Sequence, residues 1–466
     1  MKLYNTLTKT IDEFTTHEDG VVKMYTCGPT VYHFAHIGNL RTYMMEDVLE
    51  KYLRFIGYDV KRTMNITDVG HLTSDADTGE DKMVKGAKRE HKTVMEIAKQ
   101  YTDAFFKDCD DLNIRKPDII VPATSYVGKF IKVIKSLQEK GYAYVSGGNV
   151  YFDTSKSENY GQLAGLSDNK EDLKVGVRSD VDEDLNKKNK NDFVLWFTKS
   201  KFEDQELKWN SPWGTGYPGW HIECSCISME NLGEYLDLHC GGVDNIFPHH
   251  TNEIAQSEAY IGHKWCTQWF HVQHLNDQSG KMSKSKGEFL TVSLLKEKGY
   301  NPLAYRFFCL QSHYRKPLTF TYDSLDNCAL AYNKLYAKVA SLGTEGEVDK
   351  DRLASFRKAF TDAMDFDLNT AQGITVLYDV LKSDANDVTK REAINEIDSV
   401  FSLGLRDAKP EVKREVDEAR IESLIAERAE AKKNKNYARA DEIRNSLAEE
   451  GIILVDTPQG TTYKVQ

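Results

Sequence analysis

Long apolar runs are missing from this chain of 466 residues, as is the cysteine spacing of a disulfide framework. No run approaches the roughly 20 apolar residues that a membrane helix needs, and residues 1–5 do not begin a signal peptide. The eight cysteines are scattered, which is typical of a reducing compartment. Internal repeats and low-complexity tracts are also missing. We therefore expect a cytoplasmic enzyme of three or four domains with a large core.

An excess of positive charge is missing too. The chain has 61 Lys and Arg against 72 Asp and Glu, a formal net charge of −11. This balance argues mildly against a nucleic-acid partner. Two basic patches, residues 187–190 and 432–435, could override it locally, although such patches are more often solvated surface.

Two short motifs stand out against this background. Residues 36–39 read His-Ile-Gly-Asn, and residues 281–285 read Lys-Met-Ser-Lys-Ser. Around the first motif we expect a buried strand over residues 21–25 and a helix that begins at Gly38. A loop between a strand and a helix N-terminus forms an anion site from backbone N–H groups and the helix dipole. The first motif therefore predicts a phosphate site, in which His36 donates a hydrogen bond where charge develops and Gly38 allows close approach.

The second motif supplies mobile positive charge. Lys281 and Lys284 suit the β- and γ-phosphates of ATP, and the serines and Gly287 suit a loop that closes over the nucleotide. Together the motifs predict activation of a carboxylate by ATP, giving an acyl-adenylate and pyrophosphate. Their order resembles that of class I aminoacyl-tRNA synthetases, which implies ATP with Mg²⁺ as a substrate.

Candidate metal ligands lie in three separate parts of the chain. Cys27 ends the first predicted strand, beside the nucleotide loop. His249 and Glu253 are four residues apart, so a helix would place both on one face. Two thiolates, one imidazole and one carboxylate are a plausible zinc shell. The residues alone leave two choices open, Cys224 or Cys226 and His249 or His250, and buried thiols and core histidines are the ordinary alternative.

Five longer stretches resemble the signatures of the cysteinyl-tRNA synthetase family. They are residues 27–32, 65–69, 219–225, 247–253 and 456–461. The resemblance runs from about residue 3 to residue 463. It implies one zinc ion per chain, which binds the thiolate of the substrate cysteine. Zinc favours a thiolate over a hydroxyl, so serine would be rejected without an editing domain. The implied zinc ligands are Cys27, Cys224, His249 and Glu253.

The same resemblance implies ligation of cysteine to the 3′ end of tRNA(Cys) by a monomer that needs no membrane. The catalytic residues would be His36, Asn39, Lys281 and Lys284. ATP would be bound by His36, Gly38, Asn39, Gly241, Asp244 and Lys284. The cysteine pocket would include Thr67, Trp220 and Asp244. The tRNA would be contacted by Lys432, Asp441, Arg444 and Asp456.

Some positions depart from the family pattern. Asn39 stands where the first motif of the class ends in His; it still donates a hydrogen bond, so we expect weaker phosphate stabilisation rather than inactivity. Cys240 replaces a glycine, and its thiol could compete as a zinc ligand. Tyr217 stands where Arg is frequent, without a physical explanation from the sequence. Lys432 also stands where Arg is common, and the two residues differ at bidentate sites.

The motif positions predict an α/β fold. A Rossmann-type nucleotide-binding catalytic domain with an insertion is followed by an α-helical bundle and a small C-terminal helix-plus-hairpin domain. In the last domain, Ala440, Ile443 and Leu447 share a helix face, and Gly451 is expected to end that helix. The expected segments are the catalytic halves 1–122 and 213–276, the insertion 123–212, the mobile-loop and bridging module 277–323, the helical bundle 324–408 and the anticodon-binding domain 409–466.

Two rival functions remain open from the sequence. One is a ligase that joins activated cysteine to an amino sugar, which would resemble only the catalytic half. The segment from 421 to 463 favours tRNA over this rival. The other is a non-catalytic cysteine-sensing or RNA-binding relative, which Asn39 supports and the complete motif at 281–285 opposes.

Overall fold

The structure is a computed structural model that describes residues 1–69, 82–166, 184–199, 206–277, 280–281, 289–410, 417–457 and 460–465. The chain divides into two compact units, Met1–Ala408 and Lys409–Gln466. None of the described helices is long and apolar enough to cross a membrane.

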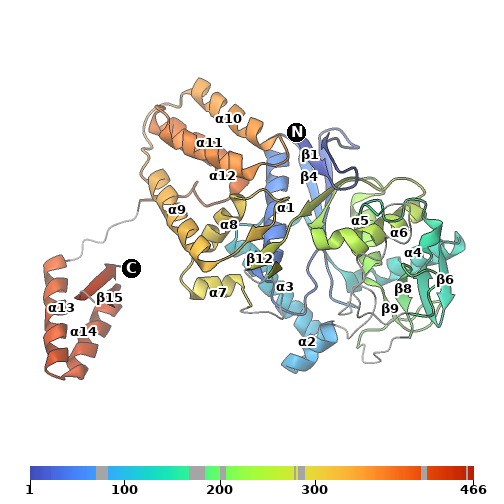
Figure 1. The fold of residues 1–466 in the computed structure, drawn as a ribbon, viewed down its shortest axis with the longest axis horizontal. Helices are drawn as coiled ribbons and strands as arrows, with labels where there is room; N and C mark the ends of the chain where they lie inside the picture. The colour runs from blue at the N-terminus through green and yellow to red at the C-terminus, as the bar shows by residue number, and fades with distance from the viewer. Residues whose placement is uncertain are drawn as a thin grey trace. The chain divides into compact units, whose positions relative to one another are not determined.

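A five-stranded parallel sheet forms the centre of the first unit (Figure 1). Its strand order is β11-β10-β3-β4-β5. Most residues of β4, β10 and β11 are buried, as is typical of the strands of a parallel sheet. Strands β4 and β5 lie on one side of β3. Strands β10 and β11, which come later in the chain, lie on the other side. In open α/β sheets, ligands bind beside such a switch point, at the carboxyl ends of the strands. The bounds are β3 Val21–Thr26, β4 Asp59–Ile66, β5 Ile119–Pro122, β10 Leu236–Gly242 and β11 Cys266–Val272.

Helix α1, Ile37–Phe55, follows β3 and is the central helix of this unit. It contacts β10, β4 and β11 of the sheet, and also α8 and α12. It is therefore buried on both sides, and its buried residues include Arg41, Glu46, Asp47 and Glu50. These charges must be compensated inside the protein.

The insertion between β5 and the second half of the sheet has a sheet of its own. The antiparallel order is β6-β7-β8-β9. Its last strand pairs Tyr217 with Phe197, so this sheet extends beyond residue 212. The two rings stack with centroids 4.9 Å apart, which gives Tyr217 a place in the packing of the insertion. The bounds are α4 Val127–Glu139, β6 Ala143–Ser146, β7 Asn149–Phe152, β8 Phe193–Phe197 and β9 Tyr217–Pro218.

The second half of the catalytic sheet carries α5 (Trp220–Leu232), η4 (Val243–Asn245), η5 (Ile246–His250) and α6 (Thr251–Ile261). A three-stranded sheet, β13-β12-β14, follows β11. It consists of β12 Leu275–Asp277, β13 Gly280–Lys281 and β14 Leu318–Thr319. Of the second ATP motif, only the backbone of Lys281 is described, and Lys284 lies outside the described residues.

A helical bundle completes the first unit. Phe360, Leu377 and Ala340 are buried in it, whereas Phe356 is only partly buried. In Figure 1 the helices α10 to α12 lie together on one side of α1. The bounds are α7 Val292–Glu297, α8 Pro302–Leu310, α9 Tyr322–Ala340, α10 Lys350–Met364, α11 Thr370–Lys382 and α12 Asp387–Phe401.

Shorter elements precede and flank the sheet. Strands β1, Lys2–Asn5, and β2, Thr10–Glu13, form an N-terminal hairpin. Between β4 and β5 lie α2, Lys82–Glu90, and α3, Val94–Asp111, which begins with a capping box at Thr93.

The second unit contains the predicted helix, α14, and the predicted hairpin, and also a further helix, α13. Ile443 and Leu447 pack with Ile421, Ile452 and Leu454 in a small separate core. The bounds are α13 Glu418–Lys433, α14 Tyr437–Glu449, β15 Ile452–Thr457 and β16 Gly460–Val465. Gly451 follows α14 with a positive φ of 79°, the conformation expected after a helix end.

Candidate active site and metal cluster

A cavity of about 450 Å³ opens at the carboxyl ends of β3, β4 and β10, beside the switch point of the sheet. Predicted metal ligands and residues of the first ATP motif both line this cavity. The predicted site residues on its wall are Cys27, His36, Gly38, Asn39, Thr67, Trp220, Cys224, Gly241, Asp244 and His249.

Four of the side chains meet in a cluster. The donor atoms of Cys27, Cys224, His249 and Glu253 all lie within 4.8 Å of one another. They come from the end of β3, from α5, from η5 and from α6. The Cys27 Sγ lies 3.9 Å from the Cys224 Sγ, 3.6 Å from the His249 Nε2 and 3.9 Å from a Glu253 oxygen.

These separations fit a tetrahedral zinc ion. With Zn–S near 2.3 Å and Zn–N near 2.0 Å, the edges of a tetrahedron are roughly 3.3–3.8 Å. The His249 Nε2 and the Glu253 Oε1 are closer, at 2.9 Å, a hydrogen-bond distance. Two soft thiolates and an imidazole also suit zinc by donor type. The donors present therefore fit the metal that the sequence predicts.

The ionisable groups of the cluster shift one another's pKa values in both directions. Burial opposes the ionised form of Glu253, but His239 and His249 outweigh it and lower the pKa of that carboxyl to about 2. Burial likewise opposes the thiolate of Cys224, yet hydrogen bonding by Cys27 and the nearby His249 lower its pKa to about 6. Metal binding requires deprotonated ligands. The other two members of the set are shifted the opposite way: burial and the neighbouring Cys224 raise the pKa of Cys27, and, against the effect of burial, Glu253 and Cys224 raise the pKa of His249 to about 10. In the metal-free cluster, His249 is therefore the cation that Glu253 and Cys224 face.

Further histidines hold the ligands in place. The His249 Nδ1 lies 3.0 Å from the His221 Nδ1, which leaves its Nε2 to face the cluster. The Nε2 of His239 lies 2.9 Å from the second oxygen of Glu253. Such partners orient metal ligands and fix their tautomers. Sequence reasoning missed both residues; His221 lies on the same helix as Cys224, whereas nothing in the sequence pointed to His239 in β10.

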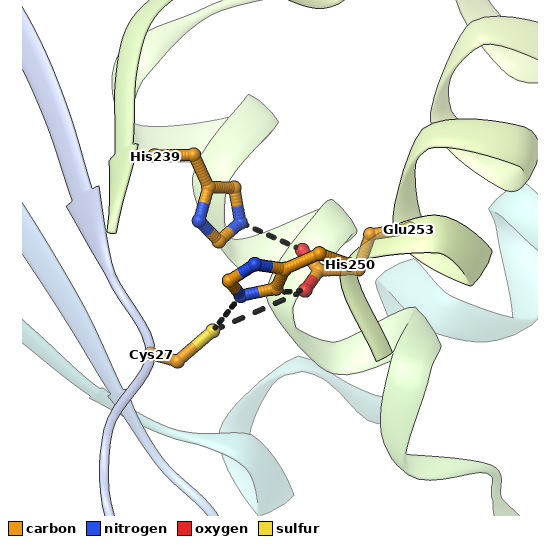
Figure 2. Close-up of side chains that lie close together, drawn as sticks. All are labelled: Cys27, His239, His250 and Glu253. Carbon is orange, nitrogen blue, oxygen red and sulfur yellow. Dashed lines mark hydrogen bonds and ion pairs between the residues drawn. The ribbon is translucent and has the colours of Figure 1, made fainter. Parts of the chain in front are cut away.

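A second set of donors shares two members with the first (Figure 2). The donor atoms of Cys27, His239, His250 and Glu253 also lie within 4.8 Å of one another. The His250 Nε2 is 3.3 Å from the Cys27 Sγ, and its Nδ1 is 2.7 Å from the Nε2 of His271. Of this set, only Cys27 lines the cavity. A metal ion there would face the interior rather than an incoming ligand.

The two remaining cysteines of interest lie outside both sets. Cys226 is buried on α5. Cys240 is buried in β10 opposite Thr26 of β3 and packs in the apolar core, so the described geometry does not make it a competing ligand.

The residues predicted for the cysteine pocket surround the cluster. The ring of Trp220 stacks on His249 with centroids 4.0 Å apart. The Thr67 hydroxyl donates to Glu223 at 2.9 Å and accepts from Asn65 at 3.0 Å. Asp244 is exposed at the cavity and lies 3.5 Å from the Nε2 of His274.

The first ATP motif caps α1. His36 is the residue before the helix, and its Nδ1 accepts a hydrogen bond from the backbone N–H of Asn39 at 3.1 Å. A neutral imidazole bonded in this way carries its proton on Nε2 and can donate it. A Cβ on Gly38 would lie 3.0 Å from the His36 ring, so glycine allows this ring to fold over the helix end. The first turn has no acidic residue, which suits an anion.

The predicted tRNA contacts lie in the second unit. Asp441 and Arg444 are exposed, three residues apart on α14, and Lys432 is exposed in the last turn of α13. Asp456 lies in β15, where the position of its side chain is outside the described residues.

Family models match most of the chain. Residues 13–329 match the class I (C) tRNA synthetase catalytic domain, residues 359–402 the DALR domain and residues 418–463 the cysteinyl-tRNA ligase anticodon-binding domain. Among solved structures, methionyl-tRNA synthetase of Mycobacterium tuberculosis with methionyl-adenylate has a similar fold. Its TM-score is 0.56 at 14% identity, over 83% of this chain and 91% of that one.

Relatives are similar over their full length. A cysteine–tRNA ligase of Treponema denticola is 45% identical over 100% of this chain and 99% of its own. Those of Borrelia turicatae and Burkholderia lata are 44% and 43% identical, over 100% and 99% of this chain and 99% and 96% of their own. The chain belongs to the cysteine–tRNA ligase family of class I aminoacyl-tRNA synthetases.

Proposed function

We propose that the chain activates cysteine with ATP and transfers it to the 3′ end of tRNA(Cys). One observation supports this most directly. Three members of the cluster, Cys27, Cys224 and His249, line the same cavity as the helix end at His36, so a small amino acid on the cluster would lie beside a phosphate site. The domain order of the family, with an anticodon-binding domain at the end, supports tRNA as the acceptor.

Selection of cysteine follows from the donors. When bound, zinc would be held by the four residues of the first set and would bind the thiolate of the substrate as an additional, fifth ligand. The chain itself supplies the walls: Trp220 stacked on His249 limits the size of the side chain, and Thr67 and Asp244 provide polar atoms for the amino group. Serine lacks the thiolate, and a site built around a specific bond rejects an analogue without it by about 10⁴–10⁵-fold.

Adenylate formation follows from the other part of the cavity. The carboxylate of cysteine attacks the α-phosphorus of ATP, whose Mg²⁺ is brought with the nucleotide. His36 and Asn39 stabilise the charge that develops on the α-phosphate, while Lys281 and Lys284 neutralise the departing pyrophosphate. Such a reaction depends mainly on positioning and charge stabilisation. Gly38 and Gly241 allow the nucleotide to lie close to the backbone.

Transfer to tRNA uses the second unit for recognition. Lys432, Asp441, Arg444 and Asp456 are the proposed contacts with the anticodon end. Base-edge contacts give sequence specificity, whereas phosphate contacts mainly position the nucleic acid.

The experiment is cysteine-dependent ATP–pyrophosphate exchange, run beside charging of tRNA(Cys) transcripts with the zinc-loaded protein. We expect both activities with cysteine and neither with serine. Exchange without charging, together with ligation to an amino sugar, would contradict the tRNA acceptor and favour the rival ligase. Absence of exchange would contradict the enzymatic function altogether.

A further inference from the structure

A single buried side chain on the helix that follows the first ATP motif contacts the segments that lead into β12 and β14, beside the second motif. Arg41 lies on α1, in the first two turns after His36, and is fully buried. Its guanidinium donates hydrogen bonds to four backbone carbonyls. The acceptors are Gln273 at 2.6 Å, His274 at 2.7 Å, Lys316 at 2.8 Å and His313 at 3.4 Å.

These carbonyls belong to two segments that build the sheet under the second motif. Gln273 and His274 connect β11 to β12, and His313 and Lys316 precede β14. The β12 strand pairs with β14 on one side and with β13 on the other, where Asn276 lies opposite Lys281. The first lysine of the second motif is therefore one strand away from the segment that Arg41 holds.

The other end of the motif is also fixed to α1. The backbone N–H of Ile37 donates to the carbonyl of Leu290 at 2.9 Å, just beyond the motif in the chain. Leu275 of β12 would lie 3.5 Å from a Cβ on Gly38, so the two elements already touch at the first motif. Arg41 thus contacts the chain before β12, and Ile37 contacts Leu290, so α1 is bonded to the described residues on either side of the second motif.

The electrostatics of Arg41 differ from those of the other fully buried arginines in the first unit. Arg62 and Arg306 pair with carboxylates, Arg62 with Glu50 and Arg306 with Asp47. Among the described residues, Arg41 has no carboxylate within ion-pair distance. Burying a cation without a counter-charge is costly, and burial lowers the pKa of Arg41. A planar guanidinium with five donors can bind two chain segments at once, which a lysine ammonium cannot do in the same geometry.

We propose that Arg41 is a positioning residue for adenylate formation, which sets the distance between the His36 end of α1 and the hairpin that begins the Lys281–Lys284 loop. The inference rests on the proposed function, since it concerns the ATP-dependent step of that reaction. A displacement of about 1 Å between catalytic groups can cost about 100-fold in rate. Loss of the four-carbonyl contact should therefore impair the use of ATP without impairing the cysteine cluster, whose residues Arg41 does not contact.

The test compares Arg41→Lys with Arg306→Lys, both in the full-length, zinc-loaded protein. Arg306 is a matched control: it is equally buried on α8, donates to the Leu112 and Phe401 carbonyls, and does not contact the β12 segment. In ATP–pyrophosphate exchange, Arg41→Lys should lower kcat/KM for ATP by about 10- to 100-fold. The KM for cysteine and the zinc content should stay within about twofold. Arg306→Lys should lower the Tm but leave kcat/KM for ATP and the KM for cysteine within about threefold of those of the unaltered chain.

Coupling between the motifs gives a second measurement. If Arg41 acts through the hairpin, Lys281→Ala should lower kcat/KM for ATP by a factor at least about threefold smaller in the Arg41→Lys background than in the unaltered chain. The reason is that the effects of contacts that act together are not additive. Should Arg41→Lys fail to fold, Leu275→Ala loosens the same junction and should show the same ATP-selective loss.

Three results would overturn the inference. The first is a kcat/KM for ATP in Arg41→Lys or Leu275→Ala that stays within about threefold of that of the unaltered chain. The second is an equal impairment of the use of ATP and of cysteine, and the third is that the losses in kcat/KM for ATP caused by Arg41→Lys and Lys281→Ala are additive. Lack of exchange in the unaltered chain would instead overturn the proposed function, so the two failures are distinguishable.

Discussion

Two members of the proposed ligand set, His249 and Glu253, each contact a histidine that is outside that set. His221 faces the Nδ1 of His249, and His239 faces one oxygen of Glu253. These contacts leave one atom of each ligand directed at the cluster. These contacts also explain why His221 and His239, although polar, are buried.

The ligand set is tested by a matched pair of cysteines on one helix. Cys224→Ser should lose the zinc and the activation of cysteine, because a hydroxyl is a poor ligand for zinc. Cys226→Ser should keep both, since Cys226 is buried on α5 outside both donor sets. Zinc content per chain and pyrophosphate exchange are the measurements. Equal losses in the two variants would contradict the assignment, and loss in His250→Ala with retention in Cys224→Ser would favour the second donor set.

Glu46 presents a different case, a buried carboxyl with weak compensation. Burial raises its pKa to about 8, although Arg62 at 3.6 Å acts in the opposite direction. Neither of its oxygens has a hydrogen-bond partner among the described residues. Between an unfolded pKa near 4.5 and the folded value, the folded protein retains a proton that the unfolded chain releases. Stability should therefore fall as the pH rises through this range.

Glu46→Gln removes this dependence, since an amide does not ionise. The free energy of unfolding of the variant, relative to that of the unaltered chain, should rise by at most about 1.4 kcal/mol per pH unit between pH 5 and 8. Melting temperatures of both proteins over this range are the measurement. A constant difference, or one that falls with pH, would show that Glu46 is ionised and paired with Arg62.

The donor types could be predicted from the sequence, but their arrangement could not. The spacing of His249 and Glu253 indicated a shared helix face, and their separation of 2.9 Å agrees with it. Nothing in the residues alone brought Cys27 to within reach of Glu253, 226 positions later; only the family resemblance did so. His239 could not be predicted at all, because it lies in a strand without a spaced partner.

At the scale of elements, the loop after β3 is placed by a close approach of two backbones. A Cβ on Gly28 would lie 1.6 Å from the carbonyl oxygen of Asn65, at the end of β4. The N–H of Gly28 also donates to the Asn65 side chain at 2.8 Å. Since Cys27 is the preceding residue, this contact decides where its thiol lies.

Gly28→Ala should therefore destabilise the chain by about 1–3 kcal/mol or more, because the added methyl group forces the two strand ends apart. Zinc content should fall with it. Gly128→Ala is the matched control: Gly128 lies within α4 with open space around it, so alanine there should stabilise by about 0.5–1 kcal/mol. The measurements are Tm and zinc content. Full zinc occupancy and an unchanged Tm in Gly28→Ala would contradict this account.

Local elements could be predicted where one signal dominated. The strand expected over residues 21–25 is β3, and the helix expected to begin at Gly38 begins at Ile37. The sheet of the insertion was not predicted, because its strands are only two to five residues long and their pairing joins positions far apart. Short strands carry too little periodicity to distinguish them from loops.

At the scale of the whole molecule, the chain divides after Ala408 into two units that have separate cores. Every residue proposed for ATP, cysteine or zinc lies in the first unit, and every proposed anticodon contact lies in the second. Chemistry and recognition of the tRNA are therefore separable by truncation.

Truncation after Ala408 should leave cysteine-dependent pyrophosphate exchange within about threefold and should weaken charging of tRNA. Arg444→Ala should act in the same direction more mildly, costing about 1–3 kcal/mol if it contacts a base edge. The measurement is the ratio of charging efficiencies for the unaltered tRNA and one changed in the anticodon. The full chain should discriminate strongly and the truncated chain should not. Undiminished discrimination after truncation would show that the tail does not read the anticodon.

The position of β3 in the sheet has a consequence for the synthesis of the chain on the ribosome. One neighbour, β4, is translated soon after β3, but the other, β10, begins at Leu236, roughly 210 residues after β3 ends. At about 5–20 residues per second, that edge of β3 waits roughly 10–40 s for its partner. An unpaired apolar strand edge is a template for aggregation. The nascent chain is therefore most vulnerable, and most in need of a chaperone, while the insertion is being made.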